Sequence, residues 1–125
     1  MKLPSSQTDE MSLSAFGEKA RTMLIRRDYS GLANQFGYAL AYDRAPAAAI
    51  EADFLSAVAS PHNAQSGSRP PTKVKYFAPN DTGLFAVVEC TVPVALDAFV
   101  LLELIVAGKG EEKNIFVEDI SGVAA

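Results

Sequence analysis

The chain has 125 residues, of which 49% are hydrophobic and 21% charged, the size and balance of one globular domain. Lys and Arg number 11 against 15 Asp and Glu, and the formal net charge of -4 excludes nucleic-acid binding as the main task, because neutralising phosphates requires a concentrated basic surface. The one cysteine, Cys90, excludes an intramolecular disulfide, and with the one histidine, His62, it falls short of a zinc site, so we expect no metal and no cofactor.

The sequence contains no stretch of about 18 apolar residues, the length that a membrane-spanning helix requires. Residues 1–10 are mostly polar and lack the apolar segment of a secretory signal. We therefore expect a cytoplasmic protein that contacts neither a membrane nor nucleic acid.

The first helix follows a polar start. Residues 1–11 predict a flexible tail, and residues 12–125 predict a single α+β domain. From Ser12, apolar side chains recur at spacings of three and four and predict a helix that ends near Arg27. Ser12 or Ser14 is the expected N-cap.

Residues 30–43 fit two interpretations. Leu32, Phe36 and Leu40 are four apart, as in a helix. Residues 36–42 also alternate between apolar and small side chains, as in a strand. The alanines of this segment favour the helix, and both interpretations stay open at this stage.

A third helix and a β-rich half complete the chain. Pro46 suits a first helical turn, and an apolar stripe follows it as far as Pro61. Residues 60–72 are rich in proline and small polar residues and predict a mobile internal connector. Beyond it, the pattern changes to four strand-like runs: Thr72–Pro79, Leu84–Val94, Ala98–Gly108 and Asn114–Ser121. Short connections favour hairpins, so the predicted fold is α+β, with two to three helices on one face of a four-stranded antiparallel meander.

If residues 37–43 form a strand instead, the order of elements resembles the cone-shaped, cystatin-like domains related to nuclear transport factor two. That resemblance implies a curved sheet that holds a pocket on one face, and subunits that pair through the sheet. It implies no catalytic residue in this sequence.

The two faces of the predicted sheet differ in composition, because alternate strand residues point to opposite sides. One set is wholly apolar and is expected under the helices, with an inert, buried thiol at Cys90: Leu84, Ala86, Val88, Cys90, Val92, Val100, Leu102, Leu104 and Val106. The other set is largely apolar but carries one glutamate per strand: Phe85, Val87, Glu89, Thr91, Phe99, Leu101, Glu103 and Ile105. A face that meets only water is mostly polar, so we expect another molecule, or the domain's own helices, to cover this one.

The predicted hairpins align acidic residues in a row. They pair Glu89 with Glu103, Glu103 with Glu118, and Val74 with Glu89, and a slip of one residue in register removes the row. Like charges directly opposite are destabilising, and three carboxylates in an apolar setting do not all ionise without a counter-charge. The row is therefore solvated or paired with Lys or Arg, or it binds a polar or cationic ligand or a hard cation.

Two functions follow, and we expect the first. The chain is a small acidic interaction domain, more a binding protein than an enzyme, which forms a homodimer or binds and blocks a protein partner. Its interface residues are Phe85, Val87, Phe99, Leu101 and Ile105. The alternative is a ligand-binding or catalytic pocket between a curved sheet and the helices, with Glu89, Glu103, Glu118 and Tyr76 as its polar groups; no catalytic residue is assigned.

Overall fold

The computed structural model describes residues 1–63, 71–108 and 110–123. The helices are α1 (Glu10–Ile25), α2 (Tyr29–Phe36) and α3 (Pro46–Ala59), with single 3₁₀ turns η1 (Ser5–Gln7) and η2 (Ala39–Ala41). The strands are β1 (Lys2–Leu3), β2 (His62–Asn63), β3 (Thr72–Tyr76), β4 (Leu84–Ala95), β5 (Ala98–Ala107) and β6 (Lys113–Ser121). The predicted α+β class with an antiparallel sheet is confirmed, but the sheet has six strands rather than four.

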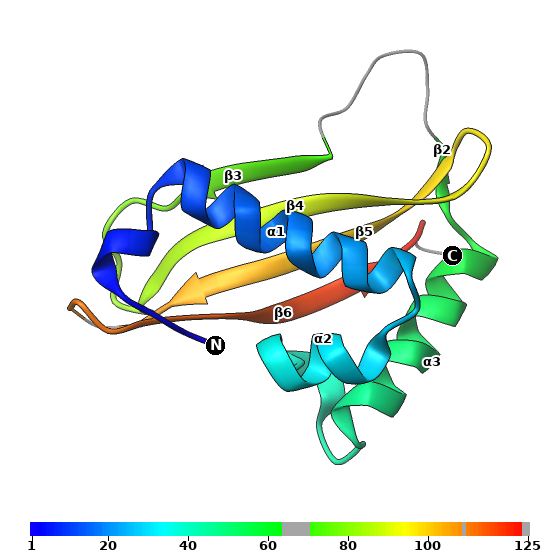
Figure 1. Ribbon diagram of the computed structural model, residues 1–125, viewed down its shortest axis with the longest axis horizontal. Coiled ribbons are helices and arrows are strands. Elements are labelled where there is room, and N and C mark those ends of the chain that lie inside the picture. Colours follow the sequence, from blue (N-terminus) through cyan, green and yellow to red (C-terminus); the bar gives the residue numbers. More distant parts are fainter. Residues whose placement is uncertain (64–70, 109, 124–125) are drawn as a thin grey trace.

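One sheet and the helices in front of it make up the molecule (Figure 1). The strand order is β1-β6-β5-β4-β3, and β2 pairs with the first residues of β5. Helix α1 crosses β3 and β4, while α2 and α3 pack on each other and α3 contacts β6. The last four strands form the predicted meander.

The two extra strands are short and carry no periodicity. Strand β1 pairs with the start of β6, and Leu3 is buried, although the composition of residues 1–11 predicts a flexible tail. Strand β2 places His62 opposite Phe99. Most of the predicted connector, residues 64–70, lies outside the described residues.

Local capping sets where the first two helices begin. The Asp9 side chain accepts hydrogen bonds from the backbone N–H and the hydroxyl of Ser12, so α1 begins at Glu10, ahead of the predicted start. Asp28 caps α2 in the same way through the N–H of Gly31, at 3.0 Å.

The segment with two interpretations is helical as far as Phe36. Gly37, with φ at 72°, ends α2, because this backbone conformation suits glycine better than any other residue. Residues 39–41 then form η2, and only Tyr38 makes an isolated bridge to Val117 of β6. The strand over 37–43 that the cone-shaped resemblance requires is not formed.

The core lies between the helices and the inner face of the sheet. The apolar set predicted under the helices is buried there, except Leu84, which is 38% exposed. A Cβ added at Gly17 of α1 would lie 2.6 Å from Cγ1 of Val88, so the glycine allows the helix to approach β4 closely. The inner face is therefore closely packed against α1, on the opposite side of the sheet from its other face.

Candidate functional site

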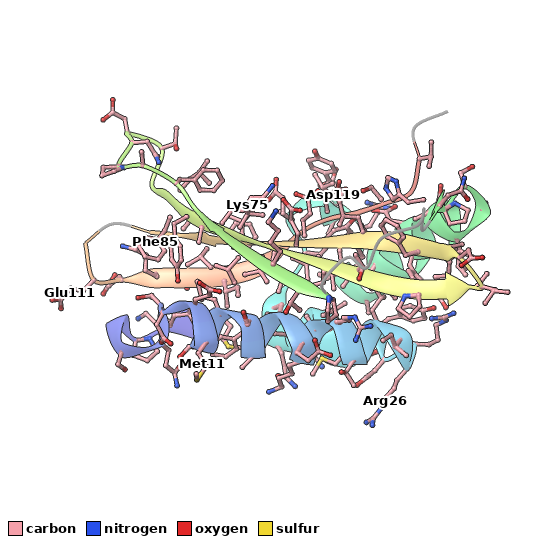
Figure 2. The ribbon with its side chains drawn as sticks, turned by 90° about the horizontal axis from the view of Figure 1, so that it is seen from above. Met11, Arg26, Lys75, Phe85, Glu111 and Asp119 are labelled. Carbon is pink, nitrogen blue, oxygen red and sulfur yellow. The ribbon has the colours of Figure 1, made fainter. Side chains whose placement is uncertain are left out.

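The candidate site is the side of the sheet away from α1, which we call the outer face. Figure 2 shows Lys75 and Asp119 on this side, opposite the layer that carries Met11 and Arg26. Its side chains come from alternate positions of β3 to β6: Lys73, Lys75, Val87, Glu89, Thr91, Phe99, Leu101, Glu103, Ile105, Phe116, Glu118 and Asp119.

An acidic row crosses the middle of the outer face. The pairing of β4 with β5 places Glu89 opposite Glu103, as the sequence predicts. On its other side, in β6, Glu103 pairs with Asp119. A bulge in β6 shifts the register between the pair Leu104–Val117 and the pair Glu103–Asp119. The predicted Glu118 is the extra residue of that bulge, and it lies beside the row.

The row ends on a lysine. The sequence predicts Val74 beside Glu89, but β3 is displaced by one residue and pairs Lys73 with Glu89. Because side chains alternate along a strand, this shift places Val74 on the inner face, and Lys73 and Lys75 on the outer face. The observed row is therefore Lys73, Glu89, Glu103 and Asp119.

Apolar rows flank the charges on both sides. On one side, Val87 lies opposite Ile105, and Ile105 lies opposite Phe116. On the other side Leu101 pairs with Thr91, and Phe99 follows toward the hairpin tip. Of these apolar side chains, Val87 is buried and the others are half-buried, so the outer face offers apolar area to an approaching molecule.

The charges on the outer face are unequally compensated. Nζ of Lys75 lies 2.9 Å from Oε1 of Glu89, and both side chains remain partly exposed. Burial raises the pKa of Glu103, and the carboxylates of Asp119, Glu89 and Glu118 raise it further, while Lys75 opposes them. The surroundings of Glu103 thus disfavour its ionised form.

Two predicted site residues lie elsewhere. A register irregularity at Phe85 turns it out of the regular alternation, and its ring packs against Tyr76 at 5.5 Å between centroids. Nζ of Lys113 lies 5.2 Å above the Phe85 ring, and Phe85 packs against the main core. The Tyr76 hydroxyl donates to the carbonyl of Thr8, at 2.9 Å, so neither residue joins the acidic row.

Sequence reasoning missed several outer-face residues. Lys73, Lys75 and Asp119 join the outer face because the register of β3 and β6 differs from the predicted one. Phe116 belongs to the predicted strand Asn114–Ser121, whose residues had no predicted face. His62, expected in a solvated connector, stacks on Phe99 with 5.1 Å between ring centroids. The alternation of β6 was the available signal for Phe116, whereas nothing local marks His62.

A second polar group adjoins the row at Asp119. The Tyr38 hydroxyl donates to Asp53 at 2.6 Å, and the Arg44 guanidinium donates to both Asp53 oxygens at 2.9 and 3.1 Å. Arg44 holds the pKa of Asp53 below its usual range, whereas burial, then Asp53 and Asp119, raise that of Tyr38. A cavity of about 240 Å³ beside this group is lined by Asp53, Ser56, Ala57, Ser60, Asp119, Ile120, Gly122 and Val123. The cavity lies between α3 and the end of β6, and Asp53, one of its two acids, is already paired with Arg44.

The chemistry of the site is limited. Among the described residues, no group of three or more His, Cys, Asp or Glu side chains is arranged to hold a metal ion. Cys90 lies on the inner face, and burial raises the pKa of its thiol to about 12, so it is not a thiolate nucleophile at neutral pH. The outer face therefore offers apolar contact and charge.

Comparison with known proteins adds no relative. No family model matches the chain, and neither the curated proteins nor the solved structures include a match to it. Within the described residues, every helix falls short of the length or the apolar character needed to cross a membrane.

Proposed function

We infer that this chain is a non-enzymatic interaction domain that binds another protein molecule through the outer face. The observation that carries this proposal is the pair of apolar rows, around Leu101 and Ile105, on the outer face. These apolar side chains do not pack against α1, which lies on the inner face. Seven of the twelve outer-face side chains are polar, but the five apolar ones lie on the two sides of the charged row, and contiguous exposed apolar area usually marks an interaction site.

Binding fits the outer face better than catalysis does. Its charged groups are two lysines and four carboxylates, Thr91 adds a hydroxyl, and the thiol lies on the opposite side of the sheet. A nucleophile held by a positioned base is the usual basis of hydrolytic or transfer chemistry, and the charged groups here suit electrostatic complementarity instead.

The proposal can be tested without knowing the partner. A carbene generated from a diazirine labels accessible side chains, both in dilute purified protein and in the cells that make the protein. We expect Leu101 and Phe116 to be labelled in the dilute protein and several-fold less in the cell, because a bound molecule covers them. Met11, which is 83% exposed on the other layer, is the control and should be labelled equally in both.

A substitution gives the matching loss of function. Leu101→Asp places a charge among the apolar rows and should restore in-cell labelling of Phe116 while the far-UV circular dichroism stays unchanged. Equal labelling of Phe116 in the cell and in dilute wild-type protein would contradict the proposal.

A second candidate has one observation in its favour. The raised pKa of Glu103 is what a ligand-binding or acid–base pocket with a polar row would show. Carboxyl titration by NMR, with and without a library of small cationic ligands, tests it. Ligand-dependent shifts at Glu103 and Asp119 would favour this candidate, and unchanged titration curves would count against it.

A further inference from the structure

We propose that the molecule bound by the outer face is a second copy of this chain. The two copies pack outer face to outer face and are related by a two-fold axis that lies in the interface, parallel to the strands, above the line between β4 and β5. In this arrangement β3 of each copy lies over β6 of the other. The inference rests on the proposed function and adds the identity of the partner and the pairing of its residues.

The outer face has a charge polarity across its strands. Lys73 and Lys75 stand on β3, at one side of the meander, whereas Glu118 and Asp119 stand on β6, at the other. The register aligns Lys73, Glu89, Glu103 and Asp119 at one height along the strands, so the basic and acidic ends of one row face opposite sides.

The symmetry operation converts this polarity into complementarity. Rotation about an axis parallel to the strands keeps each residue's height and exchanges the β3 side with the β6 side. Lys73 of one copy therefore lies over Asp119 of the other, and the same contact recurs on the opposite side of the axis. An axis across the strands would instead place β3 on β3 and lysine on lysine.

The apolar rows coincide under the same rotation. Val87 lies over Ile105 of the other copy, and Leu101 lies over Thr91. Lys75 lies over the ring of Phe116, where its stem packs and its ammonium group faces the aromatic ring. The strands of the two sheets then run in nearly the same direction, the aligned packing that twisted sheets adopt in sandwiches.

The central acids give this dimer a pH signature. Glu89 of one copy lies over Glu103 of the other, and the groups that face Glu103 are Glu89, Glu118, Asp119 and Lys75. Its pKa is already raised in the single chain, and covering it raises the pKa further. Association should therefore strengthen as the pH falls toward the range in which Glu103 takes up a proton.

The experiment is light scattering across a concentration series, on wild type and two charge reversals. Lys73→Glu alone and Asp119→Lys alone should each weaken the dimer about tenfold or more, because both symmetry-related contacts change from attraction to repulsion. An equimolar mixture of the two variants should recover the dimer mass, since each remaining contact then joins opposite charges. Lys19→Glu and Glu51→Lys, exposed on α1 and α3, make the same charge changes away from the face and should leave the dimer unchanged.

The outcomes separate this inference from the proposed function. If the wild-type protein stays monomeric at every concentration and Phe116 is still protected in the cell, the proposal of a second copy is wrong. The proposed function as an interaction domain then still holds, with a different protein as the partner. A dimer that Leu101→Asp does not weaken overturns the second copy on the outer face, and if Phe116 is also labelled equally in the cell and in dilute protein, both proposals fail. If a reversal variant loses its circular dichroism signal, the neutral pair Lys73→Gln and Asp119→Asn replaces it, and each should weaken the dimer by a smaller factor.

Discussion

Leu101 and Leu102 are neighbours in β5, yet Leu102 is fully buried beneath the helices while Leu101 is half-buried on the outer face. The same contrast holds along β4, where Val88 meets α1 and Glu89 meets Lys75. The inner face is closed by the chain's own helices, so its side chains hold the fold together. Among the described residues, α1 does not lie over the outer face, where five apolar side chains flank the charged row; these are the residues proposed to contact another molecule.

The largest expected effect is on the inner face. Leu102→Ala should lower the free energy of unfolding by about 2–5 kcal/mol, because it leaves a cavity in a packed core. Leu101→Ala, the same change one residue away, should cost about 1 kcal/mol or less in dilute protein. Urea denaturation of both variants measures the difference, and equal losses would contradict the assignment of the faces.

The next effect tests the close approach of α1 to the sheet. Gly17→Ala should lower stability by about 1–2 kcal/mol, since the overpacking against Val88 outweighs the better helix propensity of alanine. In a Val88→Ala background the same substitution should cost less than in wild type, because the milder contact with Sγ of Cys90, at 3.2 Å, is then the closest one left. A thermal denaturation series on the four proteins checks this, and additive effects of the two changes would argue against a direct contact.

A smaller effect concerns Glu103 and depends on pH. Its pKa is raised in the folded chain, so the wild-type protein loses stability as the pH rises from the ordinary glutamate range through that raised pKa. Glu103→Gln should therefore be more stable than wild type at neutral pH by about 0.5 kcal/mol in dilute protein, a value limited by solvent screening. The difference should shrink as the pH falls below the usual glutamate pKa. Urea denaturation at several pH values measures it, and a pH-independent difference would exclude the charge as its cause.

The smallest effect is that of the ion pair on the outer face. Lys75→Gln removes the contact with Glu89 and should change the stability of the single chain by about 0.5 kcal/mol or less, because exposed ion pairs contribute little. Added salt should abolish even this difference. A loss as large as that of Leu102→Ala would mean that the outer face is part of the core.

The sequence predicted the layers of the molecule better than the details of its site. Helical periodicity and strand alternation reach over many residues, so the third helix, the four long strands and the buried set around Val88 could be predicted. Strands β1 and β2 have two residues each and no period to detect, and their pairing depends on contacts with β6 and β5 that are distant in sequence.

The prediction of the site was wrong by single residues in β3 and β6. The pairing of Glu89 with Glu103 could be predicted because a tight hairpin fixes the register nearby. The connection from β3 to β4 is longer, and a one-residue difference replaced Val74 by Lys73 in the row. The bulge shows in the sequence only as two polar residues between Val117 and Ile120, and that spacing does not tell which of Glu118 and Asp119 pairs with Glu103.

That bulge also determines which change of length β6 can absorb. Val117 and Ile120 both face the core, opposite Leu104 and Leu102, and two residues stand between them where a regular strand has one. Deleting Glu118 would restore strict alternation and leave every other side chain on its present face, whereas deleting a residue elsewhere in β6 would turn part of the strand inside out. A chain of this fold that is one residue shorter here would thus keep the same surface, and a comparison that requires equal lengths would misalign its acidic row.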